Sequence, residues 1–390
     1  MTLLASVGQS YGHDGREAGL QAMRQALEGA GRTPVVFGWL IASHAYALPE
    51  VLAGASDLLS NVPLLGFSTS GEITLQGRSR RSVVIGLLCA DDARARAAWA
   101  GDFVQDSRAC LQGLLAALKP DAPAGESLLL VADGLGGDHL ALCEQLPADL
   151  PAAGCLAGGE LWRGRTYQAG GRQAGSGGLA GAVLAGNIVI GQGAAHGWQP
   201  VGAPVRLTRV QGHWIRTLDH QPASETYARL FGFPAREWSH PPLSELARLY
   251  PLGVSSGDAS SEVLAPLRVE ADGSLRMNRL LPEGRLVDVL VGSLEGCRAA
   301  AGQAARQALA ALEPARPRLA VLLVDAAWQT LLELDPHVEA DAVRAVLGPD
   351  VPLIGGCTFG QLTRPAPAAA LDLLNQHILV LLFGAKTAGP

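Results

Sequence analysis

One spacing of proline, glycine and a closing glutamate or glutamine occurs three times in this chain. The motif is P-x-x-G-x-x-x-x-G-[EQ], and it covers residues 63–72, 151–160 and 352–361. A continuous apolar run precedes each motif, and such a run is typical of a strand buried on both faces. A helical segment lies between that run and the motif, and another apolar run follows the motif. The sequence therefore predicts three divergent copies of one α/β unit.

The first and third copies share a further word in their opening helix. It reads AMRQAL at 22–27 and AARQAL at 304–309. Each word follows an apolar strand that ends in Val-Gly, which for the third copy ends at Gly292. On this basis the three copies should occupy roughly residues 1–100, 100–195 and 287–385.

The copies predict a mixed α/β fold, in which repeated strand–helix–strand–strand units form helix-flanked sheets. The sheets should be mixed because the last strand of each unit can return by a short turn. Segment 196–286 differs from the copies, since it contains short apolar runs separated by turn signals such as Gln211-Gly212 and Asp272-Gly273. We expect a β-rich middle segment there.

Composition and charge exclude several classes of protein. A chain of 390 residues is too long for one ordinary core, so two or three domains are expected. The 48% hydrophobic and 17% charged content argues against disorder. The net charge is -6 and no basic stripe runs along the chain, which argues against nucleic acid as a partner.

Targeting signals and cysteine spacing favour a cytoplasmic protein. The N-terminus lacks the pattern of a signal peptide, and no uncharged apolar run is long enough to span a bilayer. The six cysteines contain no C-x-x-C pair. We therefore expect a reduced, cytoplasmic protein without a membrane partner.

Six words in the same order resemble the FIST family, in which an N-terminal FIST module precedes a FIST C-terminal module. No single word is specific, but together they extend across nearly the whole chain. They are GFSTSGEI at 66–73, HGWQPVG at 196–202, LDHQPASETY at 218–227, YPLGV at 250–254, DGSLRMNRLLPEG at 272–284 and PLIGGCTFGQ at 352–361.

The resemblance implies an N-terminal module at 1–195, built from units 1–100 and 100–195. It implies a C-terminal module at 196–390, with the β-rich segment 196–286 and a third unit at 287–390. The family is regarded as intracellular sensory modules for small ligands, and amino acids are proposed as ligands for some members. One stand-alone branch binds haem and reports nitric oxide to a partner histidine kinase. This chain is similar to that branch in length and in lacking an attached output domain.

The C-terminal module departs from the family pattern at two positions. Gln361 stands where the family usually has glutamate, and His377 stands where a threonine is expected. The resemblance therefore implies a more intact site in the N-terminal module. The oligomeric state stays open.

The haem branch directs attention to histidines, because haem iron takes a neutral imidazole held in an apolar pocket. His44, which follows the buried run 35–42 and has Tyr46 close by, is the first choice as ligand of a haem b iron. His196, which is followed by Gly197 and Trp198, is the second choice. The alternative interpretations are a surface-loop histidine at 44 and a structural histidine at 196.

A second hypothesis is a sensor of a small organic ligand, such as an amino acid, without haem. Binding would then use Ser68, Thr69, Glu72 and backbone groups where the first motif strand emerges into a loop. Tyr250 and Glu283 are further candidates for a ligand cleft between the modules, although Glu283 equally suits a turn.

A third and weaker hypothesis is an enzyme. Cys357 or Cys155 would be its nucleophile, and Cys357 is also a candidate ligand contact. A nucleophilic cysteine needs a positioned base, and no base stands at a diagnostic spacing. Buried structural thiols are the favoured interpretation, so we do not expect an enzyme.

Overall fold

The chain folds into two compact units, described here from a computed structural model. The structure describes residues 3–59, 61–121, 125–238, 240, 247–255, 261–277, 280–364 and 369–386. Unit 1 comprises Met1–Ala195 and Arg298–Pro390, and unit 2 comprises His196–Cys297. Within the described ranges, no helix is both long and apolar enough to cross a membrane.

Unit 1 contains three repeats with the same order of strands, and repeat 3 has two helices where repeats 1 and 2 have one. Repeat 1 consists of β1 (Leu4–Ser10), α1 (Gly15–Ala30), β2 (Val35–Ser43), α2 (Leu48–Ser56), β3 (Leu64–Thr69), β4 (Glu72–Thr74), β5 (Gly77–Ser79) and β6 (Val83–Cys89). Repeat 2 consists of β7 (Ala93–Ala100), α3 (Ser107–Leu118), β8 (Ser127–Ala132), α4 (His139–Gln145), β9 (Ala152–Leu156), β10 (Tyr167–Gly170), β11 (Gln173–Ser176) and β12 (Leu179–Gly186).

Repeat 3 begins before unit 2 and continues after it. It consists of β13 (Val189–Ala195), α8 (Leu294–Leu312), β22 (Pro317–Asp325), α9 (Ala326–Leu331), α10 (Val338–Leu347), β23 (Leu353–Thr358), β24 (Gly360–Thr363), β25 (Asp372–Leu374) and β26 (Ile378–Gly384). Aspartates cap the starts of four helices of unit 1 because their carboxylates accept hydrogen bonds from first-turn N–H groups. The capping residues are Asp14, Asp106, Asp138 and Asp325.

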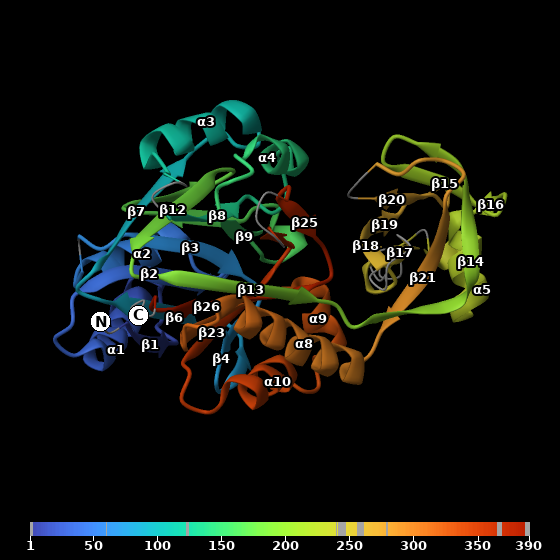
Figure 1. The fold of residues 1–390 in the computed structure, drawn as a ribbon. Coiled ribbons are helices and arrows are strands. Elements are labelled where there is room, and N and C mark those ends of the chain that lie inside the picture. The colour runs from blue at the N-terminus through green and yellow to red at the C-terminus, as the bar shows by residue number, and fades with distance from the viewer. Residues whose placement is uncertain are drawn as a thin grey trace. The chain divides into compact units, whose positions relative to one another are not determined.

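Each repeat builds the core of one six-stranded sheet and lends a hairpin to another. The strand orders are β1-β6-β2-β3-β10-β11, β25-β24-β9-β8-β12-β7 and β13-β26-β22-β23-β4-β5. The hairpin of repeat 1 thus joins the sheet of repeat 3, that of repeat 2 joins repeat 1, and that of repeat 3 joins repeat 2. In Figure 1, the blue β4 lies beside β23 of the third repeat for this reason. The predicted mixed α/β class is confirmed, since β2–β3, β8–β9 and β22–β23 are the parallel pairs.

The first strand of repeat 3 is not the one expected from the sequence. We expected the strand ending at Gly292 to open this repeat, but β21 (Leu286–Gly292) pairs with β14 (Trp198–Gln211) in the sheet of unit 2. Strand β13 pairs instead with β26, in the register Ala195↔Ile378. A long insertion therefore separates the first strand of repeat 3 from its helix, and this separation hid the strand from the comparison of repeats.

A second difference concerns the apolar run at the end of repeat 2. The apolar run that follows the second motif covers residues 179–191, and a single strand is expected there from the sequence. The chain instead breaks after β12 at Gly186, whose φ of 86° is accessible mainly to glycine. Strand β12 lies between β8 and β7 in the sheet of repeat 2, and β13 is an edge strand of the sheet of repeat 3.

The three sheets of unit 1 share one apolar cluster. Trp39 lies within it, edge-on to Phe37 at 5.8 Å, to Phe67 at 6.3 Å and to Phe383 at 6.5 Å between ring centroids. The cluster also contains Leu129 of repeat 2. Residues from all three repeats thus pack on one another, which fixes the sheets relative to each other within unit 1.

Unit 2 is β-rich, as expected. Its eight-stranded sheet has the order β18-β17-β21-β14-β15-β20-β19, with β16 beside β15. Tyr250 stacks on Phe231, with 3.9 Å between the ring centroids, and both rings contact Trp238. The remaining elements are β15 (Trp214–Leu218), β16 (Gln221–Pro222), α5 (Ala223–Phe231), α6 (Ala235–Trp238), β17 (Leu252–Ser255), β18 (Ser261–Leu264), β19 (Pro266–Val269) and β20 (Leu275–Met277).

Candidate functional site

The three motif turns meet and bond to one another. The backbone N–H of Gly158 donates to Ser68 O at 2.8 Å, and that of Cys357 donates to Gly71 O at 2.9 Å. The third link runs from Phe359 N to Leu156 O at 3.1 Å. The motif thus recurs because one turn from each repeat is needed to close this ring of contacts, which we call the motif ring.

Ser68 and Thr69 are engaged in the motif ring. The Ser68 hydroxyl donates to Gly158 O at 2.8 Å and accepts from Tyr167 N at 2.9 Å. Thr69 Oγ1 accepts from Cys357 N at 2.8 Å and lies 3.0 Å from Cys357 O. Both side chains are buried, so these hydroxyls find their hydrogen-bond partners in backbone groups at the contacts between repeats.

Glu72 is fully buried beside the motif ring. Its Oε2 accepts from the backbone N–H and the hydroxyl of Ser82, both at 2.8 Å. Its Oε1 is buried without a partner among the described residues. Burial raises the pKa of this carboxyl to about 8, and the Ser82 hydrogen bonds oppose that shift. Glu72 is therefore mostly protonated at neutral pH.

The strand register identifies the counterparts of Glu72 as two glutamines. Glu72 lies opposite Gly356, Gln168 opposite Phe67, and Gln361 opposite Cys155. Each partner directly follows the first glycine of its motif. Gln168 Oε1 accepts from Gly178 N at 3.0 Å, just as Glu72 Oε2 accepts from Ser82 N. The hydrogen bonds of Glu72 and Gln168 therefore connect the exchanged hairpins to the start of the last strand of repeats 1 and 2.

Glu160 does not take this place, although the motif aligns it with Glu72. It lies in the loop before β10, where its carboxylate accepts from Trp162 Nε1. Its side chain is 48% exposed, and its Oε1 lies 3.8 Å from His44 Nε2. The extra residues between the motif and β10 in repeat 2 displace Glu160 from the strand register.

His44 lies between the motif ring and the loop that carries Glu160. Its Nδ1 is 3.1 Å from Thr69 O, and only a protonated nitrogen can bond to a carbonyl oxygen. Tyr46 is buried and donates to Gly12 O at 2.7 Å; burial raises the pKa of its phenol. Tyr46 thus anchors the loop that follows β1.

The four candidates between residues 196 and 297 belong to unit 2. His196 Nδ1 accepts from the backbone N–H of Trp198 at 3.3 Å, and Trp198 is buried in β14. Tyr250 belongs to the aromatic cluster, and the exposed Glu283 accepts from Val210 N at 3.1 Å. The structure therefore brings together Ser68, Thr69, Glu72, Cys357 and His44, but assigns His196, Trp198, Tyr250 and Glu283 to the other unit.

The surroundings of His44 only half fit a haem. A haem-ligating imidazole has one nitrogen held by a hydrogen bond and the other facing an apolar pocket. Thr69 O meets the first requirement. The second is not met, because Nε2 faces the Glu160 carboxylate. In this arrangement His44 meets one of the two requirements for a haem ligand and fails the other.

The two candidate cysteines are fully buried. Burial raises the pKa of Cys357 to about 12 and raises that of Cys155 as well. A nucleophilic cysteine reacts as the thiolate, which such burial suppresses. Both thiols therefore behave as core side chains.

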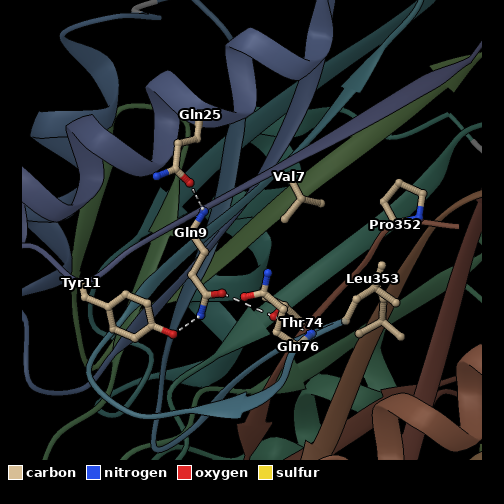
Figure 2. A pocket seen from close by; sticks show the side chains of 9 residues that line it. Val7, Gln9, Tyr11, Gln25, Thr74, Gln76, Pro352 and Leu353 are labelled. Carbon is tan, nitrogen blue, oxygen red and sulfur yellow. Dashed lines mark hydrogen bonds between the residues drawn. The ribbon is translucent and has the colours of Figure 1, made fainter. Parts of the chain in front are cut away.

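A cavity of about 330 Å³ opens beside the edge strand β1. Figure 2 shows amide and hydroxyl groups along one side of it and apolar side chains on the other. The polar lining is contributed by Gln9, Tyr11, Gln25, Thr74 and Gln76, and the apolar lining by Val7, Leu75, Pro352 and Leu353.

The cavity is connected to Glu72 by hydrogen bonds. Gln9 Nε2 donates to Ser82 Oγ at 3.2 Å, and Ser82 Oγ donates to Glu72 Oε2 at 2.8 Å. Sequence reasoning missed the cavity residues. One available signal was the glutamine shared by the words AMRQAL and AARQAL, because Gln25 and Gln307 both accept from a backbone N–H of the first strand of their repeat.

Comparison with protein families settles the class of the chain. The FIST N domain matches residues 36–221, and the FIST C domain matches residues 223–364. The chain belongs to the FIST family. FIST domains are sensory domains that bind small ligands in signalling proteins, so the predicted resemblance is confirmed. Ligand identity is a separate question.

Solved structures resemble this FIST protein only distantly. Two are cyanuric acid hydrolases, one from A. caulinodans, with TM-scores of 0.36 and 0.37 and identities of 8% and 9%; each match covers 99% of this chain and 100% of the other. Phosphoribosylformylglycinamidine synthase II from Thermotoga maritima has a TM-score of 0.23 and 12% identity, covering 100% of this chain and 73% of its own. These likenesses carry no inference about activity. A comparison with curated protein sequences found no match.

Proposed function

We propose that this FIST protein is a sensor whose small organic ligand binds in the cavity beside β1. The observation that carries the proposal is the origin of the cavity walls. Val7 and Gln9 belong to the edge of one sheet, whereas Thr74 and Leu353 belong to another. A ligand seated there contacts two sheets at once.

Such a position suits a sensor. A ligand shifts a conformational equilibrium only when it binds one conformation more tightly than the other. A molecule between β1 and the exchanged hairpin favours the arrangement in which the hairpin lies against β1. The Gln9–Ser82–Glu72 hydrogen bonds then link the occupied cavity to the motif ring.

The test is a thermal-shift screen with the twenty common amino acids and a set of uncharged metabolites of similar size. A ligand present at a hundred times its Kd stabilises the folded state by about 2.7 kcal/mol, which raises the melting temperature. We expect a compound that stabilises the parent protein to leave a Gln25→Ala variant unstabilised.

Gln307→Ala supplies the matched control. Gln307 Oε1 accepts from Ala194 N at 3.1 Å, as Gln25 Oε1 accepts from Gln9 N at 3.0 Å, but only Gln25 lines the cavity. Both variants lose the same kind of bond, and Gln307→Ala should keep the response to ligand. A stabilising compound that acts equally on Gln25→Ala and Gln76→Ala binds elsewhere and contradicts the proposal.

Haem bound through His44, with nitric oxide as signal and a histidine kinase as output partner, is the second candidate. The hydrogen bond from Nδ1 to Thr69 O supports it, and the position of Glu160 opposes it. An absorption spectrum after addition of haem decides between the two, because a Soret band that is present in the parent and lost in His44→Ala requires this histidine. The same spectrum in both proteins removes His44 as the ligand.

A further inference from the structure

We infer that the cavity beside β1 takes an uncharged molecule that presents hydrogen-bond acceptors on one side and an apolar face on the other. This inference rests on the proposed function and names the class of its ligand. Its basis is the set of side-chain amides and hydroxyls that line the cavity. These groups differ from the charged partners that a charged or zwitterionic ligand requires.

None of the residues that line the cavity carries a charged side chain. An ionised carboxylate, phosphate or ammonium group that leaves water needs a partner of opposite charge or several hydrogen bonds. The lining side chains offer amides and hydroxyls only, so an ionic ligand finds no group of opposite charge in the cavity.

The open polar groups are mainly donors. Gln25 uses its Oε1 to accept from Gln9 N, which leaves its amide N–H groups free to donate to a ligand. Tyr11 Oη lies 3.2 Å from Gln9 Nε2, an amide nitrogen that cannot accept a hydrogen bond, so the phenol O–H is left to donate elsewhere. The described residues offer no protein partner for the Gln25 amide nitrogen or the Gln76 amide. A ligand must therefore bring acceptor atoms such as a carbonyl oxygen.

The Gln9 amide is not available to a ligand. Its Nε2 has two protons for three acceptors, which are Ser79 Oγ at 2.8 Å and Ser82 Oγ and Tyr11 Oη at 3.2 Å each, and its Oε1 accepts from Thr74 Oγ1 at 3.4 Å. Gln9 thus fixes the polar wall. The facing wall of Val7, Pro352 and Leu353 in Figure 2 can contact only an apolar surface.

Repeat 3 shows how the corresponding place is closed by protein. Because Gln25 and Gln307 accept from Gln9 N and Ala194 N respectively, the counterpart of Val7 is Gln192. Gln192 Oε1 accepts from Thr363 Oγ1 at 2.7 Å and from Arg364 N at 3.3 Å, which joins the first strand directly to the exchanged hairpin. In repeat 1 the shorter Val7 makes no such link, and the cavity remains.

The test uses nicotinamide and nicotinate, which share a ring and differ in charge. Binding to the full-length protein is measured by calorimetry or by ligand-observed NMR. We expect nicotinamide to bind at least about tenfold more tightly than nicotinate, because only the carboxylate must be desolvated without a cation. Gln25→Ala should abolish nicotinamide binding, and Gln307→Ala should preserve it.

Val7→Gln is a second variant, chosen because repeat 3 already tolerates glutamine at this place. It should close the cavity and abolish binding while the protein stays folded. Nicotinate binding as tightly as nicotinamide, or a zwitterionic amino acid binding with the same sensitivity to Val7→Gln, overturns the ligand class but leaves the proposed site standing. If neither probe binds, or if binding ignores Gln25→Ala and Val7→Gln, the inference fails. If a ligand found in the thermal-shift screen also binds equally well to Gln25→Ala and Val7→Gln, the proposed site is wrong as well.

Discussion

At position 72 the chain places a carboxyl group where the other repeats place a carboxamide. Gln168 and Gln361 are neutral at every pH, and Glu72 resembles them only while it holds a proton. Its Oε2 accepts two hydrogen bonds from Ser82, so the proton belongs on the buried Oε1. The neutral acid thus reproduces the shape and polarity of the glutamine amides.

Replacing Glu72 by glutamine should flatten the pH dependence of stability. The pKa is about 8 in the folded protein and about 4.3 in an unfolded chain. Between these values the folded state holds a proton that the unfolded state has released, so the free energy of unfolding falls as pH rises, by several kcal/mol. Urea unfolding at pH 5 and pH 8 measures this. Glu72→Gln should lose most of the slope and Glu160→Gln should keep it; an unchanged slope in Glu72→Gln would show that Glu72 ionises normally.

Among the elements, the exchanged hairpin β4–β5 depends on a buried ion pair. Arg78 Nε lies 3.0 Å from Glu339 Oε1, and Nη2 approaches the same oxygen to 2.5 Å. The side chains are 5% and 0% exposed. The pair joins the hairpin of repeat 1 to helix α10 of repeat 3.

Replacing Arg78 by methionine should destabilise the protein by about 3–5 kcal/mol, because Glu339 is left buried without its counterion. Arg80→Met is the control, since Arg80 and Glu333 are 68% and 63% exposed and such pairs contribute at most about 1 kcal/mol. Chemical unfolding of both variants provides the comparison. Equal losses of unfolding free energy in the two variants would show that the buried ion pair stabilises the protein no more than the exposed one.

The sequence was sufficient to predict the secondary-structure elements, but it was not sufficient to predict which strands pair with one another. Continuous apolar runs predicted β2, β8 and β22, because burial on both faces leaves that pattern. The exchange of hairpins left no pattern in the sequence, since β4 and β5 have only three residues each and such short strands show little periodicity. Alignment by motif also matched Glu160 to Glu72, whereas the extra loop residues put Gln168 there. Gln25 could be identified as a cavity residue only from the fold, because the position of the exchanged hairpin makes its amide part of the cavity wall.

For the whole molecule, unit 2 is an insertion whose two ends lie together. A Cβ added to Gly197 would come 2.4 Å from Gly296 C, and Trp198 lies opposite Gly292. The cavity beside β1 and the motif ring both belong to unit 1. Unit 1 should therefore keep its fold and its site without unit 2.

Joining residue 197 to residue 296 through a short glycine linker tests this. The shortened protein should show one cooperative thermal transition and should keep the Gln25-dependent response to ligand, because every hydrogen bond of the exchanged hairpins is retained. Circular dichroism and the thermal-shift assay report the two properties. A shortened protein that folds but no longer responds would assign part of the ligand site to unit 2.

The exchange of hairpins also sets an order of events during synthesis. Hairpin β4–β5 leaves the ribosome early, but its sheet partner β23 begins about 270 residues later. At roughly 5–20 residues per second, the interval is on the order of 10–60 seconds. Throughout it, Glu72 lacks its strand partner Gly356, and the first motif turn lacks its hydrogen bond from Cys357.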